Sequence, residues 1–257
     1  MRFICTKLVE LEKIKVGAVS YLNTKPLLFG IKRSGLVEKM NLVEDYPAKI
    51  AQLLLEGRID IGLVPIAVLP KLNDYHFVTD FCIGTDGEVA SVALFSDVEL
   101  DKIDTVLMDY QSRTSVALLR ILLKYYWKKE VQIVDTKDDF RQQINDTTAG
   151  LVIGDRAFEQ RKKSKYIFDL GQVWKEMTGL PFVFAAWVAN KPINEDFEDA
   201  FNRANAYGCK HLEEVLATTP YDLYDLHAYY TQNISYNFTA DKKKGMELFL
   251  QLMTELD

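Results

Sequence analysis

The chain has 257 residues, of which 48% are hydrophobic and 26% charged, with only 7 prolines and 13 glycines. This composition excludes disordered, collagenous and low-complexity proteins, and the length allows one large domain or two modest lobes. Lys and Arg number 31 and Asp and Glu number 37, so the net charge of −6 argues against a nucleic-acid-binding surface.

Short β-rich runs alternate with helical patterns from Lys13 onward, which is typical of an α/β protein with parallel or mixed sheets. In the first part of the chain we predict strands at residues 14–19 and 60–64. One helix is predicted to begin near Thr24, because proline is tolerated in a first turn. Another is predicted over residues 47–55, which have a proline at the start and a glycine just beyond the end.

The same alternation repeats between residues 100 and 180. In order, it predicts strand 105–108, helix 112–127, strand 131–134, a helix near 137–144 and strand 150–153. From Asp196 onward, apolar residues recur at intervals of three or four. The last part of the chain is therefore expected to be helical.

Two apolar runs, residues 89–95 and 181–188, lie where the pattern changes. If both are strands that cross between lobes, the middle segment is inserted into a first lobe built from both chain ends. A ligand cleft then lies between the lobes. We therefore expect a first lobe of residues 1–92 and 188–257 and a second lobe of residues 93–187. The alternative is that the two strands lie side by side in one sheet.

Cysteine usage and hydropathy predict a cytoplasmic protein without a membrane span. Cys5, Cys82 and Cys209 are odd in number, far apart and form no C-x-x-C pair. Charged residues interrupt the N-terminal segment, so no signal-peptide core is evident. The longest apolar run, residues 182–189, is far shorter than the ~20 residues of a transmembrane helix.

Common catalytic motifs are absent from the sequence. It contains no G-x-G-x-x-G, no Walker A motif, no G-x-S-x-G and no H-E-x-x-H. Its three histidines, His76, His211 and His227, lack metal-ligand spacing. The sequence therefore indicates no metal site and no nucleotide or flavin cofactor.

Three small polar clusters each follow an apolar strand and precede a helix. They are Ser20-Tyr21-Leu22-Asn23-Thr24, Ser112-Arg113-Thr114-Ser115 and Gly154-Asp155-Arg156-Ala157. Each is expected at the carboxyl end of a strand and the amino end of a helix, where unpaired N–H groups and the helix dipole favour anions. Such a cleft suits carboxylates.

Each cluster also has a purely structural interpretation. Asn23 is able to orient a substrate hydroxyl, or it forms an ordinary Asx turn or cap. The second cluster is the densest in hydroxyl donors, yet helix capping explains it equally. Asp155 either caps a helix or orients a donor in the cleft. Ser91, within an apolar strand, needs a hydrogen-bond partner if buried, and this partner is either a ligand or neighbouring backbone.

Five segments match the pattern of one known family. They are V-S-Y-L-N-T-K-P-L at residues 19–27, G-E-V-A-S-V at 87–92, S-R-T-S at 112–115, G-D-R-A at 154–157, and D-L-G, Trp174 and T-G-L-P-F-V-F-A between 169 and 185. Together they resemble the chorismate dehydratase family, which opens the futalosine route to menaquinone in bacteria. The resemblance runs from about Lys13 to Leu252 and leaves residues 1–12 as an extension. It implies a two-lobed α/β fold like that of type II periplasmic binding proteins, each lobe a mixed sheet flanked by helices, with the ligand cleft between them.

The resemblance implies that the protein removes water from chorismate to give 3-[(1-carboxyvinyl)oxy]benzoate. Because no protein base is evident, we hypothesise that the enolpyruvyl carboxylate of the substrate takes the ring proton, with Asn23 as the catalytic residue that orients the leaving hydroxyl or the reacting arm. The expected substrate-binding residues are Ser20, Ser91, Ser112, Thr114, Ser115, Gly154 and Asp155. Chorismate is the expected partner, without cofactor, metal, nucleic acid or membrane, and the oligomeric state is not predicted.

Two alternatives stay open. The first is the sister enzyme of the same pathway, which shares the fold and acts on a futalosine derivative. That sister typically begins with a Ser-Pro-x-x-Asn-Asp segment, whereas this chain has Ser20-Tyr21-Leu22-Asn23. The second is a non-catalytic binding protein for a small anion. The lack of a signal peptide and of a lipid-attachment cysteine argues against it.

Overall fold

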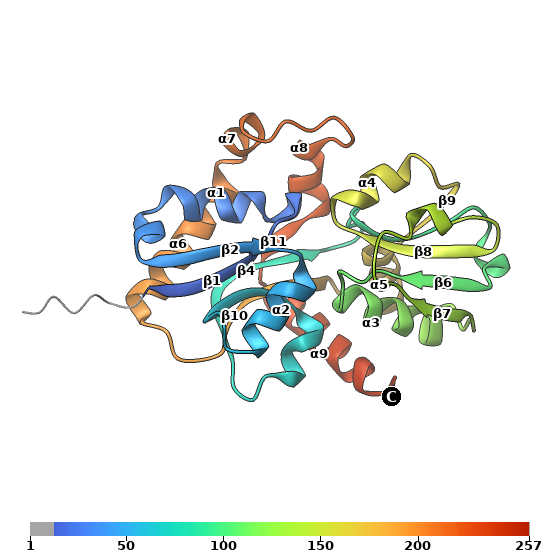
Figure 1. Cartoon of the computed structure of the whole chain (residues 1–257), viewed down its shortest axis with the longest axis horizontal. Coiled ribbons are helices and arrows are strands. Elements are labelled where there is room, and N and C mark those ends of the chain that lie inside the picture. The colour runs from blue at the N-terminus through green and yellow to red at the C-terminus, as the bar shows by residue number, and fades with distance from the viewer. Residues whose placement is uncertain (1–12, 257) are drawn as a thin grey trace, which may run out of the picture.

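Two sheets, each flanked by helices, organise residues 13–256, the part of the chain that the computed structural model describes (Figure 1). The first sheet contains β1 (Ile14–Val19), β2 (Met40–Asp45), β3 (Ile61–Pro65), β4 (His76–Thr85), β10 (Phe182–Ala189) and β11 (Ser235–Asn237). The helices around it are α1 (Lys25–Arg33), α2 (Pro47–Leu55), α6 (Glu195–Lys210), α7 (Leu212–Ala217), α8 (Leu226–Ala228) and α9 (Ala240–Thr254). The expected extension, residues 1–12 with Cys5, lies outside the described residues.

The second sheet contains β5 (Val92–Ser96), β6 (Thr105–Met108), β7 (Gln132–Asp135), β8 (Thr148–Ile153) and β9 (Tyr166–Asp169). Its helices are α3 (Thr114–Ile121), α4 (Asp155–Arg161) and α5 (Leu170–Thr178). The strand orders are β11-β4-β10-β3-β1-β2 and β7-β6-β8-β5-β9. Each sheet combines parallel pairs, such as β1 with β2 and β6 with β8, with antiparallel pairs, such as β10 with β3 and β5 with β8. The predicted α/β class with mixed sheets is confirmed.

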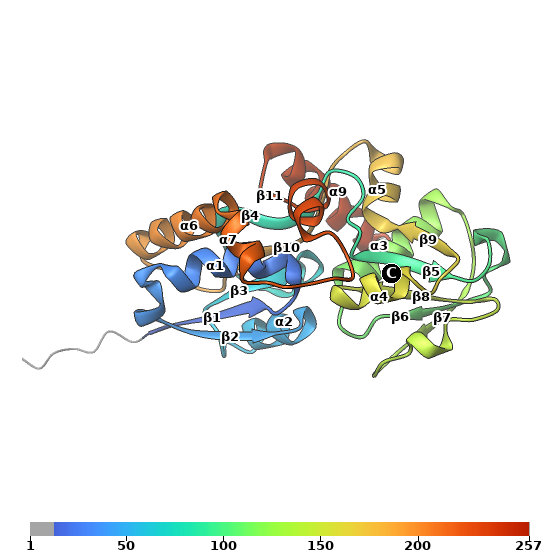
Figure 2. The same ribbon diagram turned by 90° about the horizontal axis from the view of Figure 1, so that it is seen from above.

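The two lobes lie side by side, as Figure 2 shows from above. The chain passes from the first sheet to the second between β4 and β5, and it returns between β9 and β10. The C-terminal helix α9 belongs to the first lobe by sequence but packs against α3 of the second. Beyond α9, the carbonyl of Glu255 accepts a hydrogen bond from Lys124 Nζ at 2.6 Å. Three segments therefore link the lobes.

Strand β10 belongs to the first sheet, whereas most of its residues were expected in the second lobe. All eight of its residues are buried, and it pairs antiparallel with β3 and β4. Residues 182–187, expected in the second lobe, are therefore part of the first sheet. An apolar run predicts a strand buried on both faces, but it does not identify the neighbours of that strand. We propose that the lobes divide in the connections 86–91 and 179–181.

Two predicted helical regions also differ from the structure. Near residues 137–144 only a short 3-10 turn forms, at Arg141–Gln143, because the helix-like spacing of Phe140 and Ile144 comes from their burial in a small core of the second lobe. The C-terminal region is interrupted by β11, which adds to the edge of the first sheet beside β4. Among the described residues, no helix has the length and apolar character needed to cross a membrane.

Candidate functional site

A cavity lies between the lobes, and segments of both lobes form its wall. The first lobe contributes Val19, Tyr21, Asn23, Pro47, Pro65, Ile83, Phe184 and Ala185. The crossing segment and the second lobe contribute Val89, Ser91, Val92, Ser112, Thr114, Ser115, Ile153 and Gly154. In this closed arrangement the cavity is narrow, with a volume of about 50 Å³. Apolar walls with a few convergent polar groups are typical of a site for a small molecule.

Six of the eight residues predicted from the sequence line this cavity. They are Asn23, Ser91, Ser112, Thr114, Ser115 and Gly154. They come from three strand-to-helix connections and one crossing segment, so the fold brings together positions that are far apart in the sequence.

Ser20 does not line the cavity. Its side chain is exposed, and its backbone N–H donates to the carbonyl of Asp45 at 3.1 Å. Successive residues of an extended chain point to opposite sides, so Val19 and Tyr21 face the cavity while Ser20 between them faces away. We propose no role in binding for Ser20.

Asp155 also lies outside the cavity wall, where it supports the turn that carries Asn23. Its Oδ1 accepts a hydrogen bond from the N–H of Leu22 at 3.0 Å, across the two lobes. Leu22 begins the 3-10 turn η1 (Leu22–Thr24), whose free N–H groups need such an acceptor. Asp155 therefore caps an element of the opposite lobe rather than its own helix α4.

Asn23 is held from two further directions. The hydroxyl of Thr24 donates to Asn23 Oδ1 at 3.1 Å, and the hydroxyl of Tyr236 in β11 donates to the Asn23 carbonyl at 2.9 Å. Thr24 is fully buried and Tyr236 nearly so. Thr24 belongs to the same polar cluster as Asn23, but the cluster does not show which of its groups bond to each other, and Tyr236 lies outside the predicted clusters.

Ser91 is completely buried, and its Oγ accepts a hydrogen bond from the hydroxyl of Tyr229 at 2.7 Å. Tyr229 is also completely buried, and this burial raises the pKa of its phenol well above the usual value. It begins the π-helix η7 (Tyr229–Asn233), an irregular helical segment of a kind frequent at functional sites. Tyr229 was not predicted as a site residue, because its only signal in the sequence is a run of aromatic residues near the C-terminus.

The hydroxyls at the start of α3 accept hydrogen bonds within the protein and can still donate to a ligand. Ser112 Oγ accepts from the N–H of Ser115 at 3.0 Å, so the capping interpretation holds for Ser112. Thr114 Oγ1 accepts from the N–H of Ala67, in the opposite lobe, at 3.2 Å. A serine or threonine hydroxyl that accepts one bond still has a proton to donate. The cluster thus helps to close the lobes and retains donors for a ligand.

Tyr21 contacts the second lobe through both its hydroxyl and its ring. Its hydroxyl donates to Gln111 Oε1, and its ring lies against Gly154, where an added Cβ would be 2.7 Å from Tyr21 Cε2. Gln111 also accepts, through its carbonyl, the N–H of Ala48 at 3.2 Å. These bonds and the Thr114 and Asp155 contacts hold the lobes in a closed arrangement.

No lysine or arginine is among the residues that line the cavity. The cation near its wall, Arg156, is paired with buried Asp109, with Nη2 at 2.8 and 2.7 Å from the two carboxylate oxygens. Its Nε and Nη1 are buried and have no hydrogen-bond partner among the described residues. An anion in the cavity would therefore be held mainly by hydroxyl, amide and backbone N–H donors.

Asp155 is expected to make stability depend on pH. Burial raises the pKa of this carboxyl from 3.8 to about 6, and the Leu22 hydrogen bond only partly opposes it. Because the folded state binds this proton more tightly than the unfolded chain, the free energy of unfolding falls as pH rises from about 4 to about 6. The full contribution is on the order of 3 kcal/mol.

Denaturant unfolding of the wild type and of Asp155→Asn between pH 4 and pH 8 measures this effect. Asparagine keeps an oxygen that accepts from Leu22 but does not titrate. We expect the stability of the variant relative to wild type to increase with pH over this window and then to level off. Parallel pH profiles for the two proteins would contradict the assignment.

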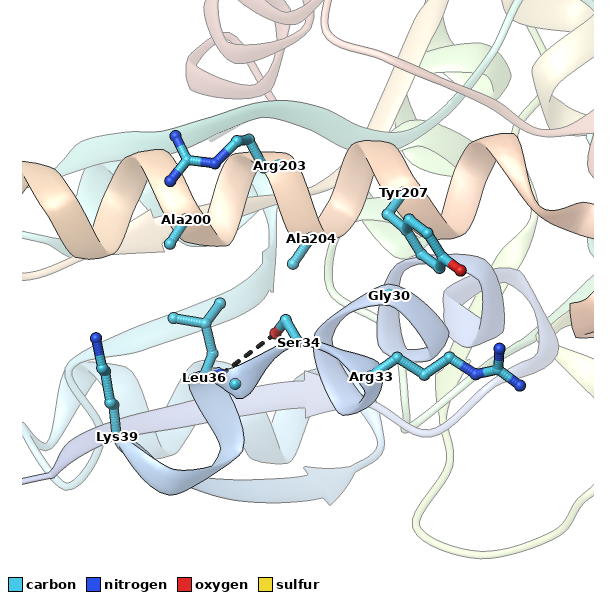
Figure 3. A pocket seen from close by; sticks show the side chains of 10 residues that line it. Gly30, Arg33, Ser34, Leu36, Lys39, Ala200, Arg203, Ala204 and Tyr207 are labelled. Atoms are coloured by element: carbon cyan, nitrogen blue, oxygen red, sulfur yellow. Dashed lines mark hydrogen bonds between the residues drawn. The ribbon is translucent and has the colours of Figure 1, made fainter.

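A second hollow lies on the outer surface of the first lobe, between α1 and α6 (Figure 3). Gly30 and Ala204 lie at its floor, where the helices approach so closely that a Cβ on Gly30 would be 1.8 Å from the Ala204 carbonyl oxygen. Arg33 at its rim is paired with Glu214 at 2.5 Å. None of the predicted site residues lines this hollow.

Comparison with known proteins identifies a family and supports the two-lobed fold. A family profile described as "Menaquinone biosynthesis" matches residues 14–255. The chain is 26% identical over 270 residues to chorismate dehydratase of Thermus thermophilus, covering 93% of this chain and 94% of the relative. A solved protein from Archaeoglobus fulgidus is similar with a TM-score of 0.73 and 14% identity, over 95% of this chain and 97% of that chain.

The periplasmic aliphatic sulphonate binding protein SsuA of Escherichia coli is similar with a TM-score of 0.62 and 17% identity, over 95% of this chain and 92% of that chain. At this identity the likeness concerns the fold alone. The two-lobed periplasmic-binding-protein fold expected from the sequence is confirmed.

Proposed function

The chain belongs to the menaquinone-biosynthesis family, and from this premise we propose that it is a chorismate dehydratase, a carbon–oxygen lyase. It converts chorismate to 3-[(1-carboxyvinyl)oxy]benzoate and water. The named activity of the Thermus thermophilus relative supports this choice of substrate. A cytoplasmic location stays a prediction from the sequence.

The observation that carries the proposal is a closed cavity rich in neutral donors and without a base. Its lining contains an amide and four serine or threonine hydroxyls, but no carboxylate, histidine or lysine. Its one titratable side chain, Tyr21, has a pKa raised far above the usual value by burial, so it stays neutral. A site of this kind binds and orients a polyanion but does not itself remove a proton from carbon.

Chorismate supplies the missing base. Its enolpyruvyl carboxylate takes the proton from the ring carbon that bears the ether, and the electrons of that C–H bond form the new ring double bond. The C–O bond at the neighbouring carbon breaks, and the departing hydroxyl takes up the proton from the carboxyl group and leaves as water. The ring becomes aromatic, so the products are strongly favoured. Elimination of water involves no net oxidation or reduction, and the reaction therefore requires no redox cofactor.

The protein contributes orientation and charge stabilisation. Asn23 orients the leaving hydroxyl or the reacting arm, and Ser91 holds the same end of the substrate. The hydroxyls of Ser112, Thr114 and Ser115 bind a carboxylate. Closure of the lobes over the substrate excludes water and completes the site.

The test is to incubate purified protein with chorismate in metal-free buffer. We expect a product lighter by one water in mass spectrometry and the ultraviolet absorption of an aromatic ring, both above the no-enzyme control. Unchanged chorismate with folded protein would overturn the proposal. Thermal protection by a futalosine derivative, with chorismate inert, would instead favour the sister enzyme of the pathway. Binding of chorismate without turnover would favour a binding protein.

A further inference from the structure

We propose that Thr24 and Tyr229 are positioning residues that fix the hydrogen-bond polarity of Asn23 and Ser91, so that both present donors to the cavity. The inference rests on the proposed function and deepens it. Neither Thr24 nor Tyr229 is among the residues that line the cavity. Both therefore act through the residues that do.

Thr24 determines which end of the Asn23 amide is free. An asparagine side chain has an oxygen that accepts and an NH₂ group that donates, and the two ends are exchanged by a simple rotation. The fully buried Thr24 hydroxyl donates to Oδ1 at 3.1 Å and so occupies the accepting end. The NH₂ group is then the end available to a ligand.

Tyr229 determines where the Ser91 hydroxyl proton points. Its own hydroxyl donates to Ser91 Oγ at 2.7 Å, so Oγ is the acceptor in this bond. Its ring is held edge-on by Phe158, with the centroids 5.0 Å apart. The Ser91 proton has no acceptor among the described residues, while Ser91 itself lines the cavity. That proton is therefore available to a ligand.

The two arrangements lie beside each other. Thr24 with Asn23 and Tyr229 with Ser91 form two hydrogen-bonded pairs, and Asn23 and Ser91 are their members in the cavity wall. Asn23 also lowers the pKa of the Tyr229 phenol, which is the effect of a neighbouring donor. An amide NH₂ group has two N–H bonds, so one remains for a ligand. In the low dielectric of an interior, a hydrogen bond to one end of a group strengthens the donor at its other end.

This polarity suits the reaction. Chorismate has two carboxylates, and the elimination develops negative charge on the departing hydroxyl. Donors that already point at these oxygens lower the barrier without reorganisation. A rotated Asn23 amide would instead turn a lone pair toward an anion. Thr24 therefore favours the productive rotamer of Asn23 and disfavours the repulsive one.

Two substitutions at position 24 separate the effect of the hydroxyl group from the effect of side-chain shape. Thr24→Val keeps the branched shape and removes the donor, whereas Thr24→Ser keeps the donor and removes a methyl group. We expect kcat for chorismate to fall about 10- to 100-fold in Thr24→Val and in Tyr229→Phe, with KM changed less than about threefold. Thr24→Ser is expected to stay within about threefold of wild-type kcat.

Tyr224→Phe is the matched control for Tyr229→Phe. Tyr224 also packs on Phe158, with the centroids 4.6 Å apart, but its hydroxyl donates to Asn233 Oδ1 at 3.2 Å and not to a cavity residue. We expect near-wild-type kcat for it. Equal losses in Thr24→Val and Thr24→Ser, or in both tyrosine variants, would mean that packing and not polarity matters, and would overturn the inference.

A second readout does not depend on turnover. In ¹⁵N-labelled protein, the Asn23 side-chain NH₂ signals, assigned by their loss in Asn23→Asp, are expected to shift in Thr24→Val and to return in Thr24→Ser. Wild-type protein that is inert toward chorismate but shows this pattern would sink the proposed function and leave the amide orientation standing. Unchanged Asn23 signals in Thr24→Val would overturn the orientation itself.

Discussion

Replacing Asn23 with aspartate is expected to lower kcat/KM for chorismate about 1000-fold. The substitution is nearly isosteric, but it removes the amide donor and adds a negative charge beside a dianion. Two like charges about 4 Å apart repel by about 4 kcal/mol at an effective dielectric constant near 20. Because each ~1.4 kcal/mol of barrier is a factor of ten in rate, this repulsion alone accounts for the expected loss.

The control for Asn23→Asp is the same chemical change at Asn41, an exposed residue of β2. Asn41→Asp is expected to retain wild-type kcat/KM, and circular dichroism should give closely similar folded spectra for both variants. The proposed mechanism has no place for Asn23→Asp protein that turns chorismate over at the wild-type rate. Such a result would show that Asn23 has no role in the mechanism and that other donors in the cavity wall orient the substrate.

Local sequence patterns were sufficient to predict much of the cavity wall. Asn23, Ser112 and Gly154 each follow an apolar strand and precede a helix, and strands of one lobe end on the side that faces the other lobe. The same pattern misplaced Ser20, because position within a cluster does not determine which way a side chain points. A one-residue step along an extended chain reverses the facing side.

Contacts between distant segments could not be predicted in this way. Tyr236 and Tyr229 approach Asn23 and Ser91 from β11 and from a π-helix, which were expected to be ordinary helix. Asp155 was expected to cap a helix or to orient a donor in the cleft, yet it accepts the N–H of Leu22 in the opposite lobe. Such pairings depend on how the two lobes close, and a single sequence without an alignment carries no local signal for them.

The substitution Gly154→Ala is expected to disfavour closure of the lobes and so to lower activity strongly. Gly154 has φ 66° and ψ −153°, a backbone conformation that is essentially confined to glycine. An added Cβ would also be 2.7 to 2.8 Å from three atoms of the Tyr21 ring. Backbone strain of about 1 to 3 kcal/mol and an overpacking cost of similar size act together against the closed state. We expect kcat/KM for chorismate to fall about 100-fold or more.

The matched control for Gly154→Ala is Gly57→Ala. Gly57 has the same φ of 66°, but nothing lies within 4 Å of a Cβ added there. Its substitution is expected to lower Tm modestly and to leave kcat/KM near wild type. Small-angle scattering separates loss of closure from loss of folding: Gly154→Ala should remain folded with a larger radius of gyration than wild type in the presence of chorismate or its product. If Gly154→Ala instead contracts like wild type and loses no activity, the contact between the Tyr21 ring and Gly154 does not control closure. The closed cavity must then be held by the hydrogen bonds between the lobes that involve Gln111, Thr114 and Asp155.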